Sequence, residues 1–214
     1  EKENFWPAEA PSKGPNGVCG PCSEIYFDHE SGTAFPDSEG LEDLPAPRFL
    51  EIGNCVFTQF DRQSDASLKP LPQKNIDVGL GLERIVAVLQ GAENNFETDL
   101  FRPYLSHVAK LSGVEYGVDK DKDIRMRRIA DHVRAITFCI ADGALPSNEG
   151  RGYVVRKILR RAARDGYELG LTKPFLCDMV DVVGDVMGDQ YPEVRGNAAQ
   201  CRAVIRAEEE NFLV

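Results

Sequence analysis

The sequence has 214 residues, of which 42% are hydrophobic and 28% are charged, and its formal net charge is −10 at pH 7. These values are those of an ordinary soluble protein, with enough apolar residues for one large core or two modest ones. No apolar run approaches the length of a membrane span, so we exclude a membrane-spanning protein and expect a cytoplasmic location. The chain opens on Glu1-Lys2-Glu3-Asn4, with neither an initiator Met nor a signal-peptide pattern, and we therefore expect a fragment of a longer protein.

The first half of the chain predicts strands. Residues 1–22 are rich in Pro and Gly and indicate a loop. Alternating or β-branched and aromatic residues predict three strands, and polar segments with several prolines predict the connections between them. The strands are expected at residues 23–28, 49–60 and 74–78, and the connections at 29–48 and 61–73. The third strand leads into a helix at residues 82–90, which has an apolar stripe at helical spacing.

The second half predicts helices without strands. Helical periodicity is found at residues 97–112, 124–141, 151–166, 174–188 and 195–213. We find no internal repeat. The pattern predicts an α+β fold that divides near Phe96 to Leu100, with a strand-containing domain at residues 1–100 and an all-helical domain at residues 101–214.

Positive charge is concentrated in one stretch. Residues 124–164 contain ten basic and three acidic side chains, although the whole chain is acidic. Such asymmetry lets one face attract phosphates while the remainder of the molecule repels them. A salt-bridged, solvated helix face is the alternative interpretation.

Two of the six cysteines are spaced like a site. Cys19-Gly20-Pro21-Cys22 is also the redox tetrapeptide of thioredoxins, but there it opens a helix, whereas here it follows a loop and precedes a strand. A zinc site would need two more ligands, and none is found at a paired spacing. We therefore expect neither redox chemistry nor structural zinc.

The segment Asp77-Val78-Gly79-Leu80-Gly81-Leu82-Glu83-Arg84 carries the strongest functional signal. A carboxylate at a strand end can pair with an ammonium group. An arginine in a first helical turn adds its charge to the helix dipole, which suits a phosphate. The intervening glycines allow a ligand to approach the backbone. The alternative is an ordinary β-to-α turn with a surface ion pair.

Gly-Leu-Gly-Leu-Glu-Arg-Ile after a strand resembles motif 3 of class II aminoacyl-tRNA synthetases. Five segments occur in the order seen in the alanyl-tRNA synthetase family, and with the regions between them they cover nearly the whole chain. They are residues 19–25, 50–60, 74–84, 130–135 and 146–161.

The resemblance implies an amino-acid and ATP site. Asp77 would bind the alanine ammonium group, and Gly79 would keep the side-chain pocket small. Asn54 and Val56, which share a strand face, would hold the substrate carboxylate and pack near its methyl group. Trp6 would line the pocket. Arg84 would bind the ATP γ-phosphate beside Gly81, so that Asp77 and Arg84 are the expected catalytic residues.

The implied reaction is ATP-dependent activation of L-alanine and its transfer to alanine tRNA. The alanine carboxylate would attack the α-phosphate, and Mg²⁺ would bridge the phosphates, so that positioning and charge neutralisation supply the catalysis. The family's motifs 1 and 2, which include the arginine that contacts the α-phosphate, are not among these 214 residues. We therefore expect this piece alone to activate alanine poorly or not at all.

The basic stretch implies contact with the tRNA acceptor stem. Between residues 152 and 164, one face is apolar, and the other carries cations at helical spacing, a pattern that suits a phosphate backbone. The expected tRNA contacts are Arg151, Arg156, Lys157, Arg160, Arg161 and Arg164, together with Asn148, which matches a residue that reads the G·U wobble pair. A helix cap is the alternative role for Asn148.

Departures from the family pattern concern the pocket. Gly53 stands where Trp is common, which predicts looser packing beneath the substrate strand, and Val78 replaces a frequent Thr.

A non-catalytic RNA-binding module is the second interpretation of the chain, and a thiol oxidoreductase is a distant third. An exposed sheet edge would allow the piece to self-associate.

Overall fold

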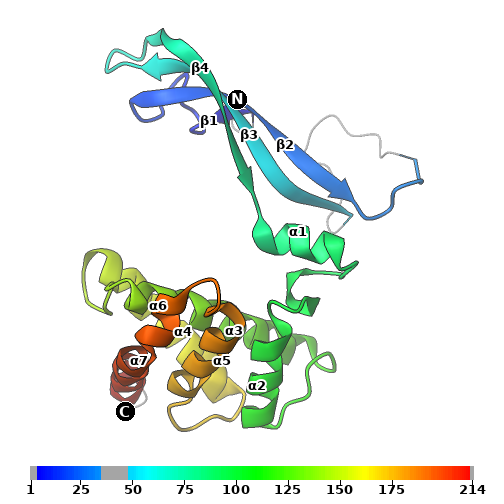
Figure 1. The fold of residues 1–214 in the computed structure, drawn as a ribbon, viewed down its shortest axis with the longest axis vertical. Helices are drawn as coiled ribbons and strands as arrows, with labels where there is room; N and C mark the ends of the chain where they lie inside the picture. Colours follow the sequence, from blue (N-terminus) through cyan, green and yellow to red (C-terminus); the bar gives the residue numbers. More distant parts are fainter. Residues whose placement is uncertain (1–3, 35–47, 213–214) are drawn as a thin grey trace. The chain divides into compact units, whose positions relative to one another are not determined.

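The structure is a computed structural model that describes residues 4–34 and 48–212. It divides into two compact units, Glu1–Asn95 and Phe96–Val214, and each is described by itself (Figure 1). The division follows Asn95, just before the region where the sequence predicts it. No helix of the described residues is long and apolar enough to cross a membrane.

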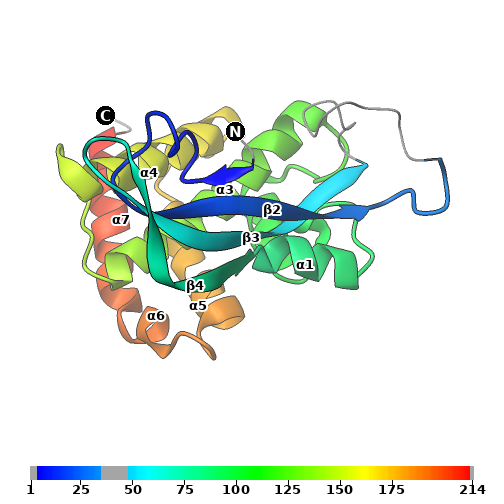
Figure 2. The ribbon, with the colours of Figure 1, turned by 90° about the horizontal axis from the view of Figure 1, so that it is seen from above.

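The first unit contains a four-stranded antiparallel sheet in the order β1-β2-β3-β4 (Figures 1 and 2). The strands are β1 (Phe5–Trp6), β2 (Gly17–Asp28), β3 (Phe49–Arg62) and β4 (Leu68–Leu80), and helix α1 (Leu82–Leu89) follows β4. The three predicted strands and the helix are therefore present. The predicted connection at 29–48 falls largely on residues 35–47, which lie outside the described residues.

The predicted loop at residues 1–22 is wrong for β1 and for the beginning of β2. Gly20 and Pro21 indicated a loop, but both lie in a strand with an irregular register between Cys19 and Cys22. A Cβ atom at Gly20 would lie 2.0 Å from the carbonyl oxygen of Phe57, so glycine allows β3 to approach closely. Glycine here marks close packing of two strands, a role that composition alone does not reveal.

The predicted connection at 61–73 is also too long. β4 begins at Leu68 and includes Pro70 and Pro72, which the sequence placed outside any strand. Among the described strands β4 lies at the edge of the sheet, where a residue without an N–H group can be accommodated. The register with β3 is irregular here: Phe60 pairs with Pro70 and Thr58 with Asn75.

Helices make up the regular structure of the described residues after Phe96. They are α2 (Arg102–Ser112), α3 (Lys120–Ala141), α4 (Gly150–Glu168), η3 (Leu176–Met179), α5 (Val180–Met187), α6 (Pro192–Gly196) and α7 (Ala198–Phe212), and the short η2 (Asn95–Glu97) spans the boundary between the units. The predicted helix at 195–213 is interrupted at Asn197, the C-cap of α6, whose amide donates to the carbonyl oxygen of Ala141 over 3.2 Å. α3 begins earlier than predicted because the Asp119 side chain accepts hydrogen bonds from the N–H groups of Asp121 and Lys122.

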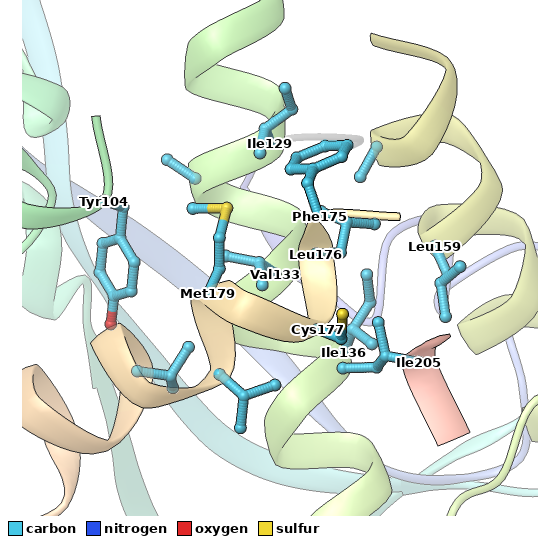
Figure 3. Packing of buried hydrophobic residues seen from close by; sticks show 14 of the residues in the cluster. Tyr104, Ile129, Val133, Ile136, Leu159, Phe175, Leu176, Cys177, Met179 and Ile205 are labelled. Carbon is cyan, nitrogen blue, oxygen red and sulfur yellow. The ribbon is translucent and has the colours of Figure 1, made fainter. Parts of the chain in front are cut away.

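The described core of the second unit is large and almost entirely apolar. It includes Tyr104, Ile129, Ile136, Leu159, Leu176, Met179 and Ile205, all of which are fully or almost fully buried. Figure 3 shows Leu176 and Met179, from η3, among Val133 and Ile136 of α3. This packing fixes α3 and α4 against each other and thereby positions the basic surface of α4.

Candidate functional site

The register of β3 and β4 brings four of the predicted substrate residues together. Val56 lies directly opposite Asp77, and Asn54 lies directly opposite Gly79. Directly paired residues point to the same face of a sheet, and so do residues two apart on one strand. These four residues therefore form one patch on one face of the sheet.

The patch has an unsatisfied polar atom and an open space. The side-chain oxygen of Asn54 is buried and has no hydrogen-bond partner among the described residues. A Cβ atom at Gly79 would meet nothing within 4 Å. Asp77 is exposed, whereas Val56 is 9% exposed and supplies an apolar floor. The combination suits a small ligand that has an apolar group and polar groups at its two ends.

Trp6 lies farther from this patch in the order of the sheet. It pairs with Gly20 on β2, and β2 separates β1 from β3. The indole is 49% exposed. Trp6 is therefore separated from the patch on β3 and β4 by one strand.

Arg84 is anchored to the backbone and side chain of Glu51. Its Nη1 donates to the carbonyl oxygen of Glu51 over 2.7 Å and to the carboxylate Oε2 over 2.9 Å. The guanidinium side chain remains 42% exposed, so the anchor leaves N–H groups for another anion. The Glu51 position lies five residues from Val56 along β3, or roughly 15 Å at the usual rise of a strand.

Gly81 lies between the patch and Arg84. It is the N-cap of α1, with φ −78° and ψ 105°, so its backbone does not require glycine. A Cβ atom there would lie 3.2 Å from Cδ of Arg84, which is closer than an ordinary contact. The missing side chain thus makes room for the stem of Arg84.

The sequence did not single out Glu51 or Cys22 for the substrate site. Glu51 was part of a quoted segment, but its pairing with Arg84 joins a strand to a helix and leaves no periodic signal. Cys22 was weighed as half of a redox motif, whereas its strand position is opposite Val56. The spacing of Cys19 and Cys22 in the sequence does not reveal their register against β3.

The structure argues against a redox role for the cysteine pair. Cys19 and Cys22 are both free and buried, and they lie on a strand. Burial raises the pKa of the Cys19 thiol, and this effect outweighs the lowering influence of the backbone of Arg62. Redox motifs depend on a lowered thiol pKa, so the environment is the opposite of the one they need.

Within the described ranges, the structure brings together no group of three or more His, Cys, Asp or Glu side chains able to hold a metal ion. Two carboxylates of the first unit are near the predicted site. Glu51 binds Arg84, and Asp77 lies in the patch on β4.

In the second unit, the predicted tRNA contacts divide into two groups. Lys157, Arg161 and Arg164 lie on the exposed side of α4, with spacings of four and three residues. Arg151 is exposed too, but it lines a pocket of about 440 Å³ at the start of α4, together with Asp142 and Val154. No carboxylate of the described residues forms an ion pair with these four cations.

Arg156 and Arg160 form the other group and bind one carboxylate. Nε of Arg156 donates to Oε1 of Glu208 over 2.9 Å, and Nε of Arg160 donates to the same oxygen over 2.8 Å. Burial raises the pKa of Glu208, but the hydrogen bonds from both arginines outweigh it, so the net pKa is lowered. The two arginines and Glu208 together contribute one positive charge.

Asn148 does not cap α4. The N-cap is Glu149, and its side chain makes no capping hydrogen bond. The Asn148 amide oxygen instead accepts a hydrogen bond from Nη1 of Arg156. The geometry therefore favours a role for Asn148 other than the helix cap.

The arginines of α3 are largely used within the protein. Nε of Arg128 donates to Asp165 over 2.8 Å, Arg125 also contacts Asp165, and Nε of Arg127 donates to the hydroxyl of Tyr116 over 2.7 Å. The salt-bridged interpretation of the basic stretch thus applies to this part of α3. The exposed cations of α4 remain available for a ligand.

The sequence is similar to known proteins along its whole length. The model of the family "tRNA synthetases class II (A)" matches residues 1–214. The chain belongs to this family. The resemblance that the motifs predicted is therefore confirmed.

Relatives within the family are similar along the whole chain. It is 48% identical over 218 residues to an alanine–tRNA ligase of Chlorobium phaeovibrioides, covering 100% of this chain and 24% of that protein. It is 49% identical over 217 residues to an alanine–tRNA ligase of Thermus thermophilus, with the same two coverages. An alanine–tRNA ligase of Pediococcus pentosaceus is 49% identical over 214 residues, which are 99% of this chain and 24% of the relative. The chain thus spans about a quarter of the length of these relatives.

Proposed function

We propose that this chain is the part of an alanine–tRNA ligase that binds the amino-acid end of alanyl-adenylate and recognises the tRNA acceptor stem. Residues 1–100 would belong to the catalytic core and residues 101–214 to the helical tRNA-recognition domain. The observation that carries the proposal is the register in which Val56 faces Asp77 and Asn54 faces Gly79. This patch can receive an ammonium group, a carboxyl group and a methyl group at once.

Each residue of the patch would meet one part of the amino acid. Asp77 would bind the ammonium group through a charge-assisted hydrogen bond, which is stronger than a neutral one. The Asn54 amide nitrogen would donate to the carboxyl end, whereas its buried oxygen, which lacks a partner, can pair only with a donor such as the ammonium group. Val56 and the open space above Gly79 would accept a methyl group.

Arg84 would serve the triphosphate. Glu51 holds one of its terminal nitrogens, so the guanidinium group is oriented before ATP arrives, while the remaining N–H groups can meet phosphate oxygens. A separation of roughly 15 Å along β3 is of the order needed to span an amino acid and an extended polyphosphate. Mg²⁺ would arrive with ATP and would supply neutralisation of phosphate charge.

The reaction needs no protein nucleophile. The alanine carboxylate would attack the α-phosphate, pyrophosphate would leave, and the terminal ribose hydroxyl of the tRNA would then displace AMP from the alanyl group. The protein would contribute orientation through Asp77 and Asn54 and charge neutralisation through Arg84. The exposed cations of α4 would bind the acceptor-stem backbone.

Binding of a non-hydrolysable alanyl-adenylate analogue tests the amino-acid site. Asp77→Asn keeps the shape of the side chain but removes the charge that pairs with the ammonium group. We expect isothermal titration calorimetry to show binding weakened roughly ten- to hundredfold, the cost of one hydrogen bond to a charged group.

Asp61→Asn is the matched control. Asp61 is also on a strand, but it lies outside the patch and accepts a hydrogen bond from Gln63 over 2.8 Å. The control should bind the analogue as the unaltered chain does. Equal affinities for the unaltered chain and the Asp77→Asn variant would contradict the assignment of the patch to the amino acid.

A further inference from the structure

Arg156 divides its hydrogen bonds between a buried carboxylate and the exposed Asn148. Its Nε and Nη2 donate to Oε1 and Oε2 of Glu208, each over 2.9 Å, while Nη1 donates to the amide oxygen of Asn148. A guanidinium group is planar and rigid, so fixing two of its nitrogens also fixes the third. Glu208 therefore determines where Arg156 presents Nη1.

The carboxylate is itself held firmly. The Glu208 side chain is 7% exposed, and Nε of Arg160 donates to its Oε1 over 2.8 Å. The guanidinium group of Arg160 lies 5.5 Å from the ring centroid of Phe212, which is on the same helix as Glu208. Because the Glu208 side chain is held in place, its position is set by the backbone of α7. Through Glu208 and Arg156, α7 therefore positions Asn148, which precedes α4.

The contact with Arg156 also decides which end of the Asn148 amide faces outward. A guanidinium N–H can bond only to the amide oxygen, because the amide nitrogen carries hydrogens of its own. With its oxygen engaged, Asn148 offers the two hydrogens of Nδ2. The wide minor groove of an RNA helix presents acceptors for them on base edges and 2′-hydroxyl groups.

We propose that Glu208 and Arg156 are positioning residues for base-pair recognition, which hold the Asn148 amide with its donors toward the minor groove of the tRNA acceptor stem. This inference rests on the proposed function, because that function supplies the acceptor stem. The inference gives the cations of α4 two different roles, phosphate binding and base-pair recognition. Lys157 and Arg161 attract phosphates irrespective of sequence, whereas Arg156 acts on which base pair is preferred.

The test compares two acceptor-stem RNA hairpins, one with the G·U pair and one with G·C in its place. Fluorescence anisotropy at fixed salt gives the ratio of their Kd values. Glu208→Gln keeps the size of the side chain but removes its charge and one acceptor. We expect the preference for G·U to fall roughly five- to tenfold, as for one lost base contact, with little change for the G·C hairpin.

Arg156→Lys distinguishes positioning from simple phosphate binding. Lysine keeps the positive charge but lacks the fork that joins Glu208 to Asn148. We expect the preference for G·U to fall as it does in Glu208→Gln. An equal weakening with both hairpins would make Arg156 a phosphate contact and overturn the proposal.

Asp165→Asn is the matched control for lost stability. Asp165 is 3% exposed and binds two guanidinium groups, those of Arg125 and Arg128, as Glu208 binds those of Arg156 and Arg160. Its loss should lower the melting temperature and leave the ratio of Kd values unchanged. If Asp165→Asn reduced the ratio of Kd values as much as Glu208→Gln does, the proposal would be overturned. The preference for G·U could then be lost through destabilisation alone.

Nuclear magnetic resonance of the free chain separates this inference from the proposed function. The Asn148 side-chain amide, identified by its loss in Asn148→Ser, has an order parameter that reports fast motion. Glu208→Gln should lower this order parameter without RNA. An unchanged value, with a normal preference for G·U in the unaltered chain, overturns only the positioning role. A lowered value, with no preference in the unaltered chain, overturns the proposed tRNA function and recognition with it.

Discussion

At the scale of single residues, the two glycines of the substrate strands have opposite surroundings. A Cβ atom at Gly79 would meet nothing within 4 Å, whereas one at Gly53 would lie 2.4 Å from Cδ2 of Leu80 and 2.9 Å from the carbonyl oxygen of Gly79. The site beside Gly53 is therefore already filled by Leu80. The looser packing that the sequence suggested at this position is not what the structure shows there.

Gly79→Ala should change ligand size selection without harming the fold. The added methyl group would occupy the open space opposite Asn54, where we place the methyl group of alanine. We expect binding of an alanyl-adenylate analogue to weaken by roughly tenfold more than binding of a glycyl-adenylate analogue, since one methyl group is worth about 1–3 kcal/mol in such a site. Calorimetric titration with both analogues measures the difference.

Gly53→Ala provides the comparison. It lies on the neighbouring strand and meets a backbone atom, so it should lower the free energy of unfolding, whereas Gly79→Ala should leave that free energy within about 0.5 kcal/mol of the value for the unaltered chain. Equal losses of affinity for both analogues in Gly79→Ala would show that the open space does not hold the substrate methyl group.

For the patch, strand geometry predicts only that Asn54 and Val56, which are two apart, share a face. That Asp77 and Gly79 belong with them was implied by the resemblance to the family, and the register of β3 and β4 places all four together. The pairings of Arg84 with Glu51 and of Arg156 with Glu208 could not be predicted, because they join elements by tertiary packing. The row of Arg156, Arg160 and Arg164 suggested a uniform phosphate-binding face, yet its first two members have an internal partner.

At the scale of elements, a buried carboxylate of α7 holds the start of η3. Oε1 of Glu209 accepts hydrogen bonds from the N–H groups of Phe175 and Leu176, each over 3.1 Å, and Oε2 accepts one from Cys177 over 3.3 Å. These are N–H groups that a helix start leaves without intrahelical partners. Glu209 is 0% exposed, and its burial raises its pKa despite the lowering influence of the three N–H groups.

Glu209→Gln should make stability less dependent on pH. Because the pKa of Glu209 is raised above its ordinary value of 4.5, the folded chain binds this proton more tightly than the unfolded chain. The resulting stabilisation is complete below the ordinary value and is lost as the pH rises through the folded pKa. Urea unfolding from pH 4 to pH 8 should therefore show the unaltered chain losing stability relative to Glu209→Gln.

Two further variants define this effect. Glu209→Ala removes every acceptor and should cost roughly 1–3 kcal/mol more than Glu209→Gln at each pH, because buried N–H groups lose their partners. Glu210→Gln changes an exposed neighbour and should leave the curve unchanged. A constant difference between Glu209→Gln and the unaltered chain over this range would contradict the raised pKa.

The sequence predicted elements well where the helical periodicity is long. It predicted them poorly where one residue type, such as proline, occurs both in connections and in edge strands. The apolar pattern of α3 and α4 was sufficient to predict both helices. Proline at positions 70 and 72 suggested a connection, but an edge strand accepts it. The break at Asn197 depends on a hydrogen bond to α3, which no local pattern contains.

At the scale of the whole molecule, the two units differ in how much apolar surface they bury. The main core of the described residues lies entirely in the second unit. The first unit exposes apolar side chains on β4, where Ile76, Val78 and Leu80 are 62%, 54% and 58% exposed. These three residues are two apart, so they lie on one face of an edge strand.

Residues 96–214 should therefore fold without the first unit, whereas residues 1–95 should not remain monomeric. The helical piece retains its complete core and should show a cooperative thermal transition by circular dichroism. The sheet piece should elute as oligomers in size-exclusion chromatography because its exposed face and edge favour self-association. A monomeric sheet piece, or a helical piece that melts without cooperativity, would contradict this division of the core.

One carboxylate that serves two arginines has a consequence for how the protein can vary. After loss of either Arg156 or Arg160, Glu208 keeps one cationic partner, whereas loss of both leaves a buried charge alone. The two positions should thus show epistasis, with the double replacement costing more than the separate ones together. As far as folding stability is concerned, either arginine can be replaced only while the other persists, or after Glu208 has been replaced by a neutral residue.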